Sequence, residues 1–184
     1  MSADGGPAAR DADPAAGDAP VPDVEARGAV ARMVPSTLVY VRRGDATLML
    51  RKARGHQQGK WNGLGGKAEP GEMPEACARR EVREEAGLEV ERLDYRGMIV
   101  FPRFDGLNDW YVWIYLATAR GEPVAGAEGE LAWIPTDRVG ELDVHEGDRV
   151  FLPWLDRPEL VFSARFDYEG GVFTGHEVAF YPRR

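Results

Sequence analysis

The sequence predicts a mixed α+β domain in which strands dominate. Several short runs of β-branched and aromatic residues are separated by turns that contain glycine, a pattern typical of strands. Residues 72–86 carry apolar side chains at helical spacing, and residues 147–155 show a weaker helical pattern. Two helices and a set of strands favour a sandwich in which the helices cover a sheet.

The length, charge and cysteine content exclude several classes of protein. The chain has 184 residues, which is enough for one domain with a hydrophobic core. Its net charge of −8 argues against non-specific binding to nucleic acid or to an anionic membrane. The single cysteine, Cys77, excludes an internal disulfide and fits a reducing compartment. No long apolar run or secretory signal is visible, so we expect a cytoplasmic protein, of open oligomeric state, with no membrane partner.

The first part of the chain differs in composition from the rest. Residues 1–30 are mostly Ala, Asp, Pro and Gly and include no aromatic residue. Such a segment cannot bury enough apolar area to offset the entropy lost on ordering. We therefore expect a disordered tail over residues 1–30 and one folded domain over residues 31–184.

The domain is expected to begin with a hairpin. Residues 37–41 and 47–50 read as its two strands, and Gly44 and Asp45 lie at the turn between them. Residues 54–62 are polar and contain glycine, which predicts a loop.

The central helix has clear signals at both ends. Pro74 suits its first turn, and Gly87 is a natural residue just past its last turn. Further strands are expected over residues 93–101, 110–119 and 131–134. The chain is expected to end with a second helix over residues 147–155, within which Pro153 disfavours regular helix, and a hairpin of residues 160–168 and 172–181.

Three carboxylates of the central helix lie on one side of it. Ala78, Val82 and Ala86 would form the core stripe, which leaves Glu81, Glu84 and Glu85 together elsewhere. Like charges at this spacing destabilise a helix by roughly 0.2–0.5 kcal/mol per pair. Two explanations remain open: ordinary surface ion pairs with neighbouring arginines, or a bound divalent cation, for which carboxylate oxygens are suitable ligands. The preceding Gly65-Gly66 would let backbone approach a ligand closely.

The same stretch resembles the Nudix box, the signature of hydrolases that act on nucleoside diphosphates linked to another group. The pattern is carried by Gly66, Glu72, Arg80, Glu81, Val82, Glu84, Glu85, Gly87 and Leu88. The resemblance implies an α/β/α sandwich with a mixed sheet and a loop-helix-loop catalytic box. It also implies Mg²⁺, or Mn²⁺, on Glu81, Glu84, Glu85 and the Gly66 carbonyl, with Arg80 among the catalytic residues and Lys67 at phosphate. A fourth carboxylate often joins such a site, and Glu128 is favoured over Glu130 as metal ligand or base.

The resemblance extends to enzymes that hydrolyse oxidised purine nucleoside triphosphates. The segment from Trp61 to Lys67 resembles the entrance to the box in that branch. It implies that Asn62 and Asp148 read the purine edge, because amide and carboxyl groups can pair with ring N–H groups. The other substrate-binding residues would be Thr37, Lys52, Phe101 and Trp110.

The branch implies Mg²⁺-dependent hydrolysis of a small nucleotide such as 8-oxo-dGTP to a monophosphate and pyrophosphate, which sanitises the nucleotide pool. Two departures weaken this assignment: Gly147 stands where mammalian members have an acid, and His145 stands at or near the place of a Trp. ADP-ribose, dinucleoside polyphosphates and unmodified dNTPs remain alternative substrates, and a non-catalytic nucleotide-sensing module remains an alternative role. An RNA decapping enzyme is disfavoured by the acidic charge.

Overall fold

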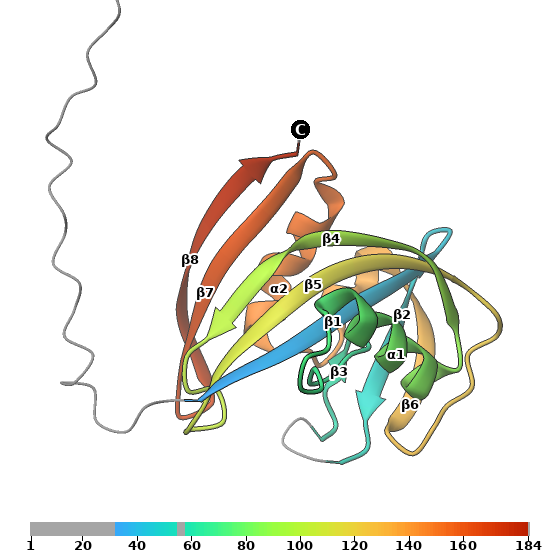
Figure 1. The fold of residues 1–184 in the computed structure, drawn as a ribbon, viewed down its shortest axis with the longest axis horizontal. Helices are drawn as coiled ribbons and strands as arrows, with labels where there is room; N and C mark the ends of the chain where they lie inside the picture. Colours follow the sequence, from blue (N-terminus) through green and yellow to red (C-terminus); the bar gives the residue numbers. More distant parts are fainter. Residues whose placement is uncertain (1–31, 55–57, 184) are drawn as a thin grey trace, which may run out of the picture. The chain divides into compact units, whose positions relative to one another are not determined.

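The computed structural model describes residues 32–54 and 58–183, and the tail expected over residues 1–30 lies outside them. Within the described residues, eight strands form one mixed sheet (Figure 1). Seven of them follow the order β3-β2-β1-β5-β4-β7-β8, and the eighth, β6, lies outside this order and pairs with β2. The pairs β1–β5 and β4–β7 are parallel, and the other pairs are antiparallel. The strands are β1 (Met33–Arg43), β2 (Ala46–Lys52), β3 (Trp61–Asn62), β4 (Glu89–Phe101), β5 (Asp109–Arg120), β6 (Gly129–Pro135), β7 (Leu160–Glu169) and β8 (Val172–Pro182).

The sheet is split between β1 and β2, and this split positions the candidate box. The two strands pair only near their hairpin turn, from Val41↔Leu48 to Arg43↔Ala46. Beyond that point the segment after β3 enters the gap, where the N–H of Val39 donates to the carbonyl of Leu64 at 2.6 Å. Part of the loop predicted for residues 54–62 is therefore a strand, β3. A two-residue strand has no periodicity of its own and forms because the gap supplies partners.

Gly65 is required at this point of the segment. Its φ is +144°, and a Cβ there would lie 2.2 Å from the backbone oxygen of Thr37. Only glycine can bring the chain this close to β1. The next residue, Gly66, then accepts a backbone hydrogen bond from Thr37 at 2.8 Å.

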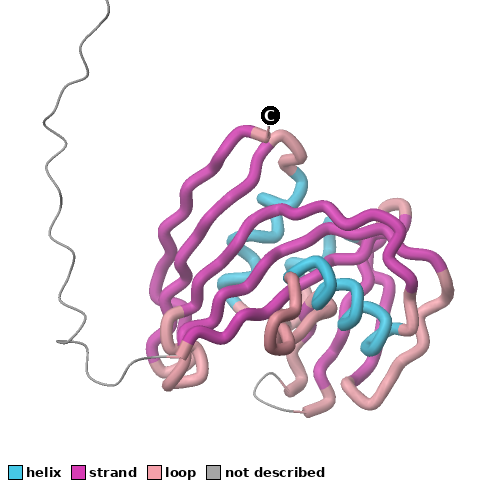
Figure 2. Tube along the Cα trace, viewed as in Figure 1, coloured by secondary structure: helices cyan, strands magenta, loops and turns pink. Residues whose placement is uncertain are grey.

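Helices cover both faces of the sheet, as Figures 1 and 2 show for α1 (Pro74–Ala86) and α2 (Glu146–Phe151). Side chains alternate along β1, so Val39 packs in the core cluster that contains α1. Tyr40 packs in the opposite cluster with Phe151 of α2. This is the α/β/α arrangement with a mixed sheet that the resemblance implied.

The ends of the helices follow local sequence signals. Pro74 occupies the first turn of α1, and Gly87 closes the helix in the left-handed region with φ of 67°. The expected start at residue 72 was two residues early. The second helix is α-helical only to Phe151 and continues as the 3₁₀ turn Leu152–Asp156, because Pro153 has no N–H to donate. A further 3₁₀ turn spans Thr136–Glu141. None of the described helices is long and apolar enough to cross a membrane.

Candidate functional site

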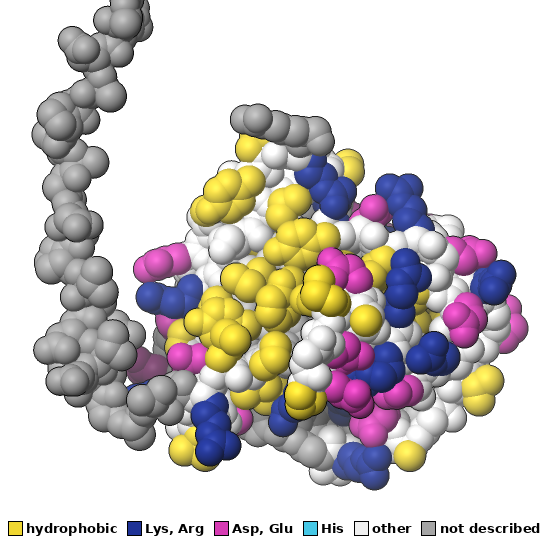
Figure 3. Space-filling model, viewed as in Figure 1, with side chains coloured by type: hydrophobic (Ala, Val, Ile, Leu, Met, Phe, Trp, Pro, Cys, Tyr) yellow, Lys and Arg dark blue, Asp and Glu magenta, His cyan; other side chains and the backbone are white. Residues whose placement is uncertain are grey.

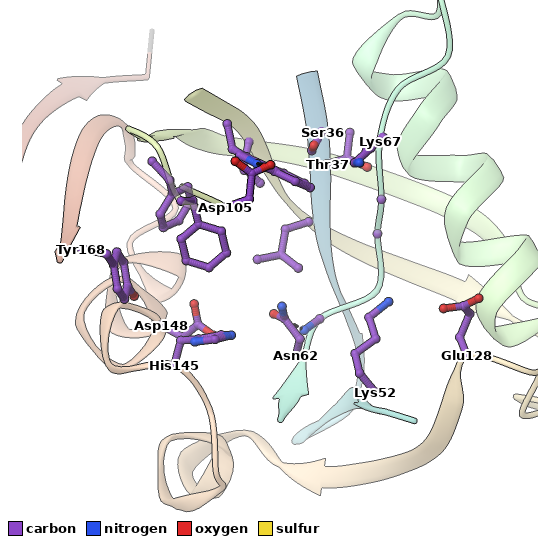
Figure 4. Close-up of a pocket in the computed structure, with 18 of the residues that line it drawn as sticks. Ser36, Thr37, Lys52, Asn62, Lys67, Asp105, Glu128, His145, Asp148 and Tyr168 are labelled. Carbon is purple, nitrogen blue, oxygen red and sulfur yellow. Dashed lines mark hydrogen bonds between the residues drawn. The ribbon is translucent and has the colours of Figure 1, made fainter. Parts of the chain in front are cut away.

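A cavity of about 520 Å³ opens where β1, the segment after β3, the β4–β5 loop and the start of α2 meet. Figure 4 shows Asp148, His145 and Tyr168 at one end, Glu128 near α1 at the other, and Asn62 and Lys52 between them. The lining residues are Ser36, Thr37, Leu38, Lys52, Arg54, Asn62, Gly63, Gly65, Gly66, Lys67, Phe101, Phe104, Asp105, Trp110, Val112, Glu128, His145, Asp148 and Tyr168. They include each of the seven residues that the sequence assigned to substrate binding.

At the α1 end, Glu85 is buried and held from two sides. Its Oε1 lies 2.6 Å from the Nζ of Lys52, and its Oε2 accepts the N–H of Gly65 at 2.8 Å. Burial raises the pKa of Glu85, while the Lys52 charge and the Gly65 hydrogen bond act in the opposite direction. The helix is thereby joined to β2 through Lys52 and, through Gly65, to the segment that fills the split.

Arg80 is the centre of an ion-pair network on the same helix. It binds both carboxylate oxygens of Glu72 at 2.9 Å and donates to Glu81 at 2.7 Å and Glu84 at 3.0 Å. A further bond reaches the backbone oxygen of Lys67 at 3.1 Å. The paired guanidinium lowers the pKa of Glu72 to about 2. On this face of the molecule, acidic and basic side chains lie next to one another over α1 (Figure 3).

The charges of the helix carboxylates can thus be balanced by ion pairs with arginine, which is one of the two explanations that the sequence left open; the other is a bound divalent cation. Among the described residues, no three His, Cys, Asp or Glu side chains converge closely enough to hold a metal ion. The donor chemistry nevertheless fits a hard cation: Glu81 lies against the Gly66 backbone, where an added Cβ would be 2.5 Å from its Oε1. Glu84 is 56% exposed, and Glu85 is within the buried pair with Lys52.

Of the two candidate acids outside the box, Glu128 lines the cavity and Glu130 does not. The Oε1 of Glu128 lies 2.7 Å from Nη2 of Arg54, which lowers the pKa of Glu128. Glu130 is 65% exposed and lies 4.0 Å from Arg51 at the edge of β6.

An amide in the middle of the cavity and a buried acid at its far end offer polar groups to a ligand. The Oδ1 of Asn62 accepts the N–H of Gly63 at 2.9 Å, which sets the orientation of the amide. Asp148 is 6% exposed, and its Oδ2 has no hydrogen-bond partner among the described residues. Burial raises the pKa of Asp148 to about 7, against smaller effects from the His145 backbone and Arg149 in the other direction.

Aromatic side chains form the walls at this end, and the sequence identified only some of them. Phe101 and Trp110 were expected, whereas Phe104 and Tyr168 were not. The ring centroid of Phe104 lies 5.3 Å from that of Tyr168 and 5.8 Å from that of His145. Phe104 comes from the β4–β5 loop, where no periodicity marks it. Phe104 therefore places an aromatic ring next to His145, the residue that stands at or near the place of a Trp.

The comparisons with known proteins agree with this geometry. The sequence model of the NUDIX domain matches residues 32–155. An oxidized purine nucleoside triphosphate hydrolase of Danio rerio is 34% identical over 144 residues, which cover 77% of this chain and 92% of that protein. The protein of the same name from Mus musculus is 35% identical over 120 residues, 65% of this chain and 77% of that protein. The crystal structure of a MutT protein from Bacillus halodurans superposes with a TM-score of 0.70 at 27% identity, covering 79% of this chain and 97% of the other.

Proposed function

We propose that this chain, which belongs to the Nudix family of hydrolases, hydrolyses oxidised purine nucleoside triphosphates such as 8-oxo-dGTP to the monophosphate and pyrophosphate. One observation carries the proposal. A single cavity runs from Gly66 and Lys67 beside the box, past Lys52 and Asn62, to Asp148 at the other end. Basic groups for a polyphosphate and hydrogen-bonding groups for a base are therefore available to one substrate. The names of the Danio rerio and Mus musculus relatives support the same substrate class.

We assign Mg²⁺, or Mn²⁺, to oxygen donors of α1 and to two residues that line the neighbouring end of the cavity, Gly66 and Glu128. The assigned ligands are Gly66, Glu81, Glu84, Glu85 and Glu128. When bound, the ion would polarise a phosphate and lower the pKa of an attacking water. Arg80 would orient the carboxylates of Glu81 and Glu84, to which it already donates at 2.7 and 3.0 Å.

The remaining roles at the box end belong to this chain's own side chains. Lys52 and Lys67 would bind the phosphate oxygens as point charges, because both residues line the cavity. Glu128 would accept the proton of the attacking water, since its carboxylate lines the same cavity and is 41% exposed. Its hydrogen bond with Arg54 keeps the carboxylate charged and therefore able to accept a proton.

Recognition of the base would rest on hydrogen bonding at the other end. Oxidation of guanine at C8 changes N7 from an acceptor into a donor. The unpartnered Oδ2 of Asp148 can accept from such an N–H, and the Asn62 amide offers a second polar contact. A buried mismatch would cost about 1–3 kcal/mol, which is enough to separate an oxidised purine from its parent. Phe101 and Phe104 would border the face of the ring.

The test is pyrophosphate release with Mg²⁺ across 8-oxo-dGTP, 2-hydroxy-dATP, dGTP and dATP, with monophosphate release from ADP-ribose and diadenosine tetraphosphate. The expected result is a kcat/KM for an oxidised purine well above that of its parent. Equal activity across the dNTPs, or a preference for ADP-ribose, would still agree with a Nudix hydrolase but would contradict the base-reading roles of Asn62 and Asp148. Cytoplasmic nucleotide-pool sanitisation, which limits oxidised bases in DNA, is the cellular role we propose.

A further inference from the structure

Tyr168, near the end of β7, is not among the residues assigned to the metal, the phosphates or the base. Its side chain points into the cavity beside Asp148 (Figure 4). Its ring is held by Phe101, Phe104 and Phe173, at centroid distances of 6.3, 5.3 and 5.5 Å. Three aromatic neighbours leave the ring little freedom, so the hydroxyl has a defined place in the cavity wall.

That place is the one that a side chain on Gly147 would occupy. A Cβ on Gly147 would lie 2.5 Å from the Tyr168 hydroxyl oxygen and 2.7 Å from a ring carbon of Phe166. Gly147 is not among the residues with positive φ, so its backbone would accept any residue. Glycine is needed here for space. The Tyr168 hydroxyl therefore occupies space that is open only because residue 147 has no side chain.

The hydroxyl still has its proton to donate. Its oxygen accepts the N–H of Gly147 at 3.1 Å, and this is its one hydrogen bond within residues 32–54 and 58–183. Asp148 follows Gly147 in the chain, and its buried Oδ2 has no hydrogen-bond partner in the described part of the chain. A donor and an acceptor thus stand side by side at the end of the cavity.

We propose that Tyr168 is a specificity-determining residue, whose hydroxyl donates to a carbonyl oxygen of the base while Asp148 accepts from the adjacent ring N–H. The pair would select a lactam edge, N–H next to C=O. Guanine has this edge at N1 and C6, and 8-oxoguanine has a second at N7 and C8. Adenine presents the opposite order of acceptor and donor. The proposal rests on the proposed function, because it requires a purine at this end of the cavity.

The first test compares Tyr168→Phe with Tyr181→Phe, which removes a hydroxyl from an exposed position on β8. The substrates are 8-oxo-dGTP, dGTP, dATP and deoxyribose 5-triphosphate without a base. Tyr168→Phe is expected to lower kcat/KM for the two guanine nucleotides by about tenfold, mainly through KM. The values for dATP and the base-free triphosphate should stay within about twofold. Equal loss on all four substrates, or no loss on any, would overturn the role of Tyr168.

The two proposals fail in different ways. A wild-type enzyme that shows no preference for 8-oxo-dGTP over dGTP contradicts the proposed function, whatever Tyr168 does. The role of Tyr168 is measured separately, by dividing kcat/KM for dGTP by kcat/KM for dATP and comparing this ratio between wild type and Tyr168→Phe. An unchanged ratio in an enzyme that does prefer 8-oxo-dGTP rejects Tyr168 alone.

Gly147→Ala tests the same contact from its other side. The added methyl would displace the Tyr168 hydroxyl. The variant should therefore show the same fall in kcat/KM for the two guanine nucleotides as Tyr168→Phe. Because both changes remove the same hydrogen bond to the base, kcat/KM for the guanine nucleotides should fall little further in the double variant than in either single variant. Fully additive losses would contradict the proposal. The melting temperature of each variant shows whether it is folded, and dATP hydrolysis provides an internal reference for active protein.

Discussion

The Nζ of Lys52 on β2 lies 2.6 Å from the Oε1 of Glu85 on α1, with side chains only 15% and 5% exposed. This ion pair connects residues 33 positions apart in the chain and joins the sheet to the helix that carries the box. Buried charges are stable only when they are paired, so each of these two groups depends on the other.

Lys52→Met is expected to destabilise the fold. It leaves Glu85 buried without its cation, and the loss should be about 3 kcal/mol of unfolding free energy, measured by urea denaturation at pH 7. Lys60→Met is the matched control, because its pair with Asp143 is largely exposed and should contribute less than about 1 kcal/mol. Similar losses in the two variants would show that the Lys52 pair is not energetically special.

Glu84→Gln separates catalysis from stability. Glu84 is 56% exposed and pairs with Arg80, so the amide should leave the melting temperature nearly unchanged. Turnover, measured as pyrophosphate release, should fall by about 10²–10³-fold if the carboxylate acts at the metal. Glu141→Gln, which removes an exposed carboxylate paired with Arg138, controls for charge alone. A variant that unfolds would instead show that Glu84 is structural.

Asn62→Ala should weaken base discrimination more than metal binding. The ratio of kcat/KM for 8-oxo-dGTP to that for dGTP is expected to fall by about fivefold or more, because one polar contact to the base is removed. Metal affinity, followed by Mn²⁺ titration, should change little, since Asn62 is not one of the assigned ligands. An equal loss for every nucleotide would indicate that Asn62 only shapes the turn with Gly63.

Asp148 should make stability depend on pH. Its pKa is raised from 3.8 to about 7 in the folded protein. Folding therefore favours the protonated form, and this stabilisation is fully present below about pH 4 and lost as pH rises through about 7. Relative to Asp148→Asn, the wild type should lose about 4 kcal/mol between pH 4 and pH 8. Urea denaturation of both proteins across this range is the measurement, and parallel profiles would contradict the raised pKa.

Deletion of residues 1–29 should leave kcat/KM within about twofold of the value for the full chain. These residues are mostly Ala, Asp, Pro and Gly, a composition that supports no packed core. The described strands begin at Met33, and each residue that lines the cavity lies beyond it. The comparison uses pyrophosphate release from 8-oxo-dGTP by both proteins. A large fall in kcat would assign a role to the tail.

Much of the fold follows from short-range signals. The limits of α1 depend on Pro74 and Gly87, and its core stripe depends on the spacing of Ala78, Val82 and Ala86. These are interactions within a few residues, which a sequence displays directly. The error at β3 has the opposite origin, because Trp61 and Asn62 form a strand only where β1 and β2 have separated.

The family, the box and the residue types along the cavity can be predicted from the order of the residues. The packing of the folded chain shows which side chains share that cavity: Glu128, which the resemblance favoured over Glu130, and two that no sequence signal marked, Phe104 from a loop and Tyr168 in the space left by Gly147. The Tyr168 contact joins residues 21 positions apart, and such a contact depends on how strands and helices pack. Helix spacing and turn residues act locally, whereas the shape of a cavity is set by side chains that meet only after the sheet has formed.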